Sequence, residues 1–184
     1  MSQVFADTRE DGDATEASDQ LSRQYLTFLL GGEEYGVDIL NVEEIKSGDR
    51  ITRLPRTPDY ILGVMNLRGD IVPVVDLRER FDIPQPEDMV IRDVVVILNI
   101  NSEAEDDAGK ARSKNGGKRI VGVVVDDVSD VYDLSADQLR ESPDLGTTIS
   151  TEFIRGIATL ASKIIIVLDT DRLFSIEELS RMDE

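Results

Sequence analysis

The hydrophobic positions of this chain gather in short runs rich in valine and isoleucine, bounded by glycine, asparagine and charged residues. Such runs are typical of β-strands, whereas amphipathic helices repeat apolar residues at intervals of three and four. Pro73 has no N–H group to donate to a neighbouring strand, so the strand that contains it is expected at a sheet edge or at a bulge. The pattern predicts a mainly β fold with strands at residues 25–30, 70–75, 93–100, 119–125 and 163–168.

Three short helices are predicted from local signals. Asp76 with Glu79, and Ser135 with Gln138, have the spacing of a capping box. A third helix is expected from about residue 170 to residue 182, because apolar residues recur there at helical intervals.

Two polar segments interrupt the strand pattern. Residues 1–22 carry six acidic side chains against one arginine. They are predicted to form a disordered acidic tail, because a segment with so little apolar area cannot offset its ordering entropy. Residues 101–118 lie between two strong strand signals, begin acidic and end basic. This segment is predicted to be a long, mobile hairpin loop.

An internal repeat organises the rest of the chain. Residues 60–83 align with residues 153–176 at an offset of 93, with eight identities in 24 positions, and an upstream block matches at an offset of 86. We interpret this repeat as two homologous halves of the chain, about 24–88 and 89–182, each of which forms a small β unit. Short strands in units of this size favour small closed barrels, with a groove along their junction.

The two copies differ around one turn. Positions that are identical in both copies indicate a common packing role. The positions that differ around the turn therefore indicate a function of the first copy alone. Arg68 offers a planar head with five donors, which suits a carboxylate or backbone carbonyls of a partner. An internal ion pair of Arg68 with Glu43 or Glu44 is the alternative, and the sequence leaves both open. The differing pairs are Asn66/Thr159, Arg68/Ala161, Gly69/Ser162 and Pro73/Ile166.

Composition narrows the function classes. The formal net charge of −18 repels phosphate backbones, so nucleic-acid binding is not expected. The chain has no histidine and no cysteine, which removes the usual groups for titration near neutral pH, metal binding and thiol chemistry. Without a signal peptide pattern or an apolar run long enough to span a bilayer, a cytoplasmic protein with no membrane insertion is expected.

The carboxylates show no catalytic arrangement. Asp126 and Asp127 are neighbours on a strand, so their side chains point to opposite faces. Asp169 and Asp171 flank an expected helix start, where acidic residues are favoured by the helix dipole. No catalytic residue, metal site or cofactor is therefore predicted. A carboxylate-based enzyme or small-ligand-binding protein on paired barrels is the rival hypothesis.

Two longer stretches resemble the chemotaxis coupling proteins of the CheW family: "EEYGVDILNVEEI" (33–45) and "LPRTPDYILGVMNLRGDIVPVVDLRERF" (54–81). The second half, with "STEFIRGIATLASKIIIVLD", is also similar, so the resemblance covers about residues 24–182. It implies two five-stranded SH3-like barrels related by duplication, and a non-enzymatic adaptor.

The resemblance also implies partners and a site. Family members couple the cytoplasmic tips of methyl-accepting chemoreceptors to the regulatory domain of a histidine kinase, in arrays at the membrane. An adaptor of a non-flagellar array, such as one for surface motility, is the alternative in the same class. No kinase-contact residues are assigned. The positions matching family residues important for receptor coupling are Val42, Glu44, Gly63, Arg68 and Gly69.

Overall fold

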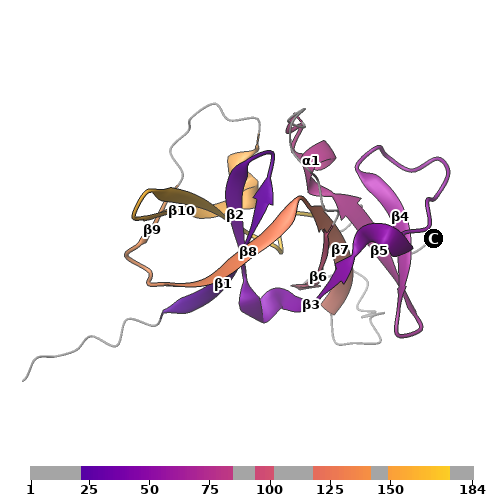
Figure 1. Ribbon diagram of the computed structural model, residues 1–184, viewed down its shortest axis with the longest axis horizontal. Coiled ribbons are helices and arrows are strands. Elements are labelled where there is room, and N and C mark those ends of the chain that lie inside the picture. The colour runs from indigo at the N-terminus through magenta and orange to yellow at the C-terminus, as the bar shows by residue number, and fades with distance from the viewer. Residues whose placement is uncertain (1–21, 85–93, 102–117, 142–148, 175–184) are drawn as a thin grey trace, which may run out of the picture.

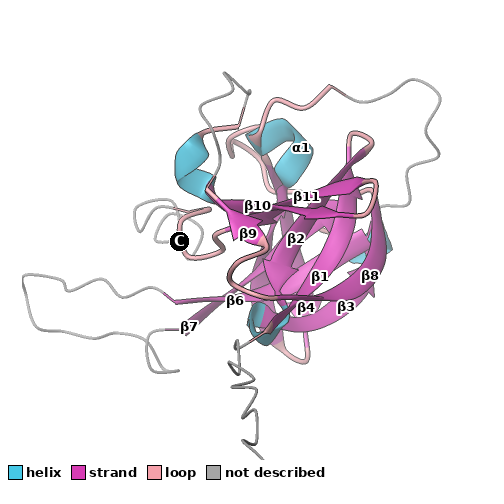
Figure 2. Ribbon diagram, turned by 90° about the vertical axis from the view of Figure 1, so that its left-hand side faces the viewer, coloured by secondary structure: helices cyan, strands magenta, loops and turns pink. Residues whose placement is uncertain are grey.

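The computed structural model describes residues 22–84, 94–101, 118–141 and 149–174 of the protein. These residues form two β-sheets that lie side by side in Figure 1, with the strands of one sheet on the left and those of the other on the right. Helix is confined, in the part described, to a few short turns (Figure 2). The predicted mainly β fold is confirmed.

The first sheet has six strands in the order β8-β1-β2-β11-β10-β9. Its strands are β1 (Arg23–Leu30), β2 (Glu33–Asp38), β8 (Asp127–Leu134), β9 (Leu139–Arg140), β10 (Ile154–Leu160) and β11 (Lys163–Leu168).

The second sheet has five strands in the order β3-β6-β7-β5-β4. Its strands are β3 (Val42–Ser47), β4 (Ile61–Leu67), β5 (Asp70–Asp76), β6 (Val94–Asn101) and β7 (Lys118–Val125). All five predicted strands are present. The short helices are η1 (Ile39–Asn41), η2 (Gly48–Arg50), α1 (Leu77–Arg80) and η3 (Thr151–Phe153).

The sheets do not follow the two halves of the chain. The β1–β2 hairpin of the first half pairs with strands of the second half, and the β6–β7 hairpin of the second half pairs with strands of the first. The halves 24–88 and 89–182 are therefore not two separate sheets. A repeat in sequence defines the order of elements, whereas sheet partners depend on which apolar faces meet. The SH3-like barrel character of each unit stays a prediction.

Strand register confirms that the repeat is structural. β5 pairs with β7 in parallel, with Val74 opposite Gly122, and β11 pairs with β2 in parallel, with Val167 opposite Gly36. The same offsets of 93 (167 − 74) and 86 (122 − 36) relate these two pairs. The β4–β5 and β10–β11 pairs also carry a bulge at equivalent positions.

One core joins the two sheets. It contains Phe28 and Val37 of the first sheet together with Val75 and Val96 of the second. Each sheet has in addition a smaller core of its own, around Met65 and its neighbours in the second sheet and around Tyr25 and its neighbours in the first. Because the largest core is shared, neither sheet can separate without exposing apolar surface.

Aromatic residues of both copies meet beside α1. The guanidinium carbon of Arg80 lies 4.9 Å from the ring centroid of Tyr60, 5.5 Å from that of Phe153 and 5.1 Å from that of Phe174. Tyr60 and Phe153 are equivalent in the repeat, and Phe81 is equivalent to Phe174. This cation–π cluster connects the copies at their junction.

The capping-box predictions have different outcomes. Asp76 caps α1 as predicted, its Oδ1 accepting from the Arg78 N–H at 2.8 Å. The prediction of a helix at Ser135 is wrong. The Gln138 Oε1 accepts from the Ser135 N–H at 3.0 Å, but the chain then enters β9, because pairing with β10 overrides the local helix signal. Most of the expected helix at 170–182 lies outside the described residues.

Pro73 lies on β5, which is not an edge strand. Val64, its partner on β4, directs its N–H and C=O to Thr52 instead, and the pairing of β5 with β7 begins only at Val74. No strand-to-strand hydrogen bond is therefore required from the backbone nitrogen of Pro73, which explains why a proline is tolerated in this interior strand.

The β6–β7 hairpin is present, with Asn101 opposite Lys118. The loop that it encloses and the predicted acidic tail lie outside the described residues. Among the residues that were described, no helix is long and apolar enough to cross a membrane.

Candidate functional site

The turn between β4 and β5 presents Arg68 and Gly69. Leu67 pairs with Asp70, so the turn has two central residues. Both have positive φ, 54° at Arg68 and 98° at Gly69, as a type I′ hairpin requires. The Asn66 Oδ1 accepts a hydrogen bond from the Gly69 N–H at 2.9 Å and braces the turn. The Arg68 side chain is 71% exposed.

The second copy repeats this turn without the arginine. Leu160 pairs with Lys163, and Ala161 has a φ of 51°, close to that of Arg68. The unusual backbone conformation thus belongs to the common framework. The guanidinium is particular to the first copy.

A single carboxylate, Glu44 on β3, lies between two cations. Its Oε1 is 3.3 Å from Arg68 Nη2, and its Oε2 is 2.8 Å from Lys46 Nζ. The hydrogen bond from Lys46, and then the positive charge of Arg68, lower the pKa of Glu44, against an opposing effect of desolvation. The internal pair left open by the sequence is therefore present, and it is made with Glu44. Glu43 instead accepts from Asn99 Nδ2 at 2.7 Å.

Gly63 and Val42 help to hold the strands β4 and β3 that carry this ion pair. Gly63 has a φ of 150°, and a Cβ there would clash with the Thr52 carbonyl oxygen and lie 2.7 Å from its carbon. Thr52 forms the β-bridge to Val64, so only glycine permits this close approach. Val42 is half-buried, packs against the shared core and lies opposite Leu98.

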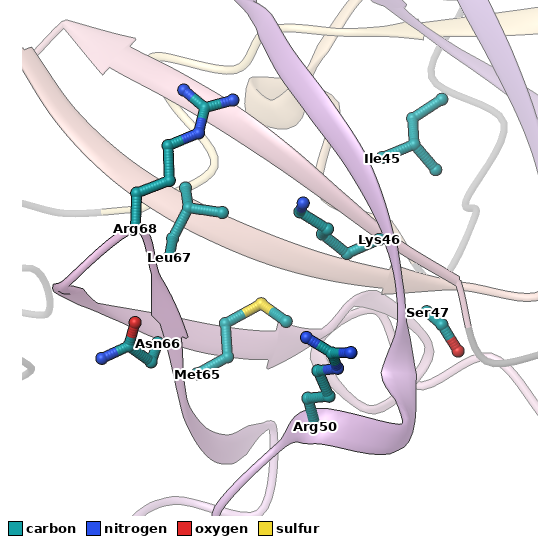
Figure 3. Close-up of a pocket in the computed structure, with 8 residues that line it drawn as sticks. All are labelled: Ile45, Lys46, Ser47, Arg50, Met65, Asn66, Leu67 and Arg68. Atoms are coloured by element: carbon teal, nitrogen blue, oxygen red, sulfur yellow. The ribbon is translucent and has the colours of Figure 1, made fainter.

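A cavity of about 490 Å³ opens beside Arg68. In Figure 3, Lys46 and Arg50 project from β3 and the segment after it, and Arg68 from the β4–β5 turn, around Met65 and Leu67. Of the five residues assigned by resemblance, Glu44 and Arg68 form an ion pair, and Arg68 lines the cavity, whereas Val42, Glu44, Gly63 and Gly69 do not line it.

Sequence reasoning missed Lys46 and Arg50. A signal for them was available, because residues 46–56 contain four basic side chains and one acidic one in a chain of net charge −18. This segment is positively charged in a chain that is strongly negative overall. A local reversal of charge of this kind indicates an interaction surface.

The most buried carboxylates make structural ion pairs. Asp126, 2% exposed, accepts from Arg78 Nη1 at 2.9 Å and from the Gly31 N–H at 2.7 Å. Asp76 accepts from Arg78 Nη2 at 2.9 Å. Through Asp126 of the second half, this network fastens together the β1–β2 hairpin and α1, which both belong to the first half. Within the described ranges, no group of three metal-ligating side chains occurs.

A family model described as a CheW-like domain matches residues 24–178. The chain belongs to the CheW family. A protein named Chemotaxis protein CheW from Klebsiella aerogenes is 41% identical over 167 residues, 91% of this chain and 90% of that protein. The scaffolding protein TtCheW from Thermoanaerobacter tengcongensis matches with a TM-score of 0.69 at 31% identity, covering 88% of this chain and 94% of its own. Protein FrzA from Myxococcus xanthus is 40% identical over 55 residues, 30% of this chain and 34% of that protein.

CheW proteins are scaffolds and adaptors of chemotaxis systems, so this chain is an adaptor and not an enzyme. The resemblance identified from residues 33–45 and 54–81 is confirmed, and the family match extends over nearly the same part of the chain as predicted.

Proposed function

We propose that this CheW-family protein couples the cytoplasmic tips of methyl-accepting chemoreceptors to the regulatory domain of a histidine kinase. A chemotaxis array is favoured over a surface-motility array, because the relative that covers most of the chain at 41% identity is named Chemotaxis protein CheW. The protein would work in the cytoplasm and reach the membrane only through the receptors.

The observation that supports a receptor site is the asymmetry between two equivalent turns. Arg68 and Ala161 share a backbone conformation, yet only Arg68 carries a donor group, and its side chain is 71% exposed. The braced turn fixes the backbone that carries the guanidinium, and the planar head with five donors favours a directional contact.

The five residues have different parts in this proposal. Arg68 contacts the receptor, and Glu44 orients the guanidinium through the 3.3 Å ion pair. Gly69 allows the turn, while Gly63 and Val42 hold β4 and β3 in place.

Coupling follows from the shared core. The principal core contains residues of both sheets, so the two sheets move as one body when either binds a partner. A receptor on the second sheet and a kinase domain elsewhere on the surface would thus be held in a defined relative orientation.

Reconstitution tests this function. The purified protein is mixed with a receptor signalling domain and the histidine kinase, and co-sedimentation and kinase autophosphorylation are measured with and without it. We expect the protein to sediment with both partners and to raise autophosphorylation. Absence of association with both partners would contradict the proposal.

A further inference from the structure

We propose that the cavity beside Arg68 binds carboxylate groups of an acidic helical segment on the partner, and that Lys46 and Arg50 are further binding residues. This inference rests on the proposed function, because it defines the chemistry that the receptor hairpin must present. None of the family assignments above includes Lys46 or Arg50.

The charge in the cavity is positive on balance. Three cationic side chains, Lys46, Arg50 and Arg68, line it. Glu44 is the carboxylate that pairs with two of them, at 2.8 Å and 3.3 Å. Arg50 makes no ion pair with any side chain in the described ranges. One carboxylate shared by two cations, beside a third cation, leaves positive potential where an anion would enter.

The cavity also has an apolar side. Met65 is 3% exposed and Leu67 6% exposed, and both belong to the small core of the second sheet. Figure 3 shows Lys46 and Arg50 reaching toward them from the opposite side. Lys46 and Arg50 can donate charge-assisted hydrogen bonds to a carboxylate, and Met65 and Leu67 bound the cavity with apolar atoms. The site therefore suits a carboxylate carried on a helix with apolar neighbours.

Overall charge selects against other anions. The formal net charge of −18 repels an extended polyanion such as a nucleic acid, which would meet the acidic surface around the patch. A short acidic segment needs only the local patch. It is attracted by Arg68, Arg50 and Lys46, which all line the cavity.

Binding to two pairs of probes tests the inference. The first pair is a purified chemoreceptor hairpin and the same hairpin with its tip carboxylates changed to amides. The second pair is a synthetic helical peptide with glutamates four residues apart and its glutamine twin. Titration calorimetry is run on the full chain and on the variants Lys46→Glu, Arg50→Glu and Arg53→Glu. Arg53→Glu makes the same charge change on a residue that does not line the cavity.

We expect Arg50→Glu and Lys46→Glu each to weaken hairpin binding by about tenfold or more, and Arg53→Glu by much less. The amide hairpin should bind weakly to the unchanged protein and lose little more with Arg50→Glu. Higher salt should reduce the difference between the two hairpins.

Failure of the inference differs from failure of the function. If the unchanged protein binds both hairpins equally, and Arg50→Glu matches Arg53→Glu, the acidic-segment site is wrong while receptor coupling stands. If no hairpin binds but the glutamate peptide does, with loss in Arg50→Glu, the site stands and receptor coupling falls. Absence of binding to any probe overturns both.

Discussion

The first copy at β3–β5 and the second copy at β8–β11 share a backbone conformation and differ in the side chains that they carry on the surface. Strand register, bulges and the positive φ of Arg68 and Ala161 are common to both. Even the exposed apolar positions Ile71 and Ile164, 66% and 60% exposed, are retained. The cluster of Glu44, Lys46 and Arg68 has no counterpart in the second copy, where the equivalent residues are Asp130, Tyr132 and Ala161. The two copies share a framework, and the charged site is present in the first copy and not in the second.

The largest expected effect concerns the close approach at the repeated glycine. Gly63→Ala should lower the free energy of unfolding by about 4 kcal/mol or more, because the new Cβ meets backbone atoms of Thr52 that cannot yield locally. Chemical denaturation measures the change.

The equivalent change Gly156→Ala should cost less. There the nearest atom, at 2.7 Å, belongs to the Leu139 side chain, which can shift, although the Arg140 carbonyl oxygen lies at 2.8 Å. Equal costs at both sites would show that the second copy is as tightly constrained as the first.

A smaller difference is expected at the repeated aspartate that ends β5 and β11. Asp76→Ala should cost about 3 kcal/mol, because it removes a buried partner of Arg78 and the cap of α1. Asp169→Ala should cost about 1 kcal/mol or less, because its ion pair to Arg172 is 3.7 Å long and largely exposed. Thermal melting of both variants compares them, and a reversed order would contradict this account of the ion-pair network.

The smallest expected effect is a pH dependence at Glu44. Its pKa is lowered from 4.5 in the folded protein, so its contribution to stability is present above pH 4.5 and is lost as the pH falls through the lowered pKa. The difference in melting temperature between the unchanged protein and Glu44→Gln should therefore shrink with acidification. A difference that stays constant at acid pH would indicate that the Glu44 charge does not stabilise the fold.

Much of the fold could be predicted because the signals are local. Runs such as residues 119–125 are apolar and β-branched, and they form strands. The strands β2, β3, β4, β8, β9 and β10 were not among those predicted. In β2 and β3, acidic residues such as Glu33 and Glu43 interrupt the apolar pattern. Exchange of hairpins between the copies could not be predicted, because it depends on which faces meet in the shared core.

The site was predictable only in part, for a similar reason. Comparison of the copies marked Arg68, and Glu44 was one of two possible partners. The choice of Glu44 depends on the β3–β6 register, which places a bulge between Val42 and Glu44. Arg50 lies in η2, outside the repeated strands, so only its position in the folded chain connects it with Arg68.

Exchange of one side chain tests the central claim most directly. Arg68→Ala places at this turn the residue that the second copy already has at φ 51°, so the backbone should accept it. Association with a receptor signalling domain is measured for Arg68→Ala, for Ala161→Arg and for the unchanged protein, with melting temperatures as the control. We predict that Arg68→Ala loses association by about tenfold or more with nearly unchanged melting, and that Ala161→Arg has no effect. Association that survives Arg68→Ala undiminished would contradict the claim that the first copy carries the receptor site.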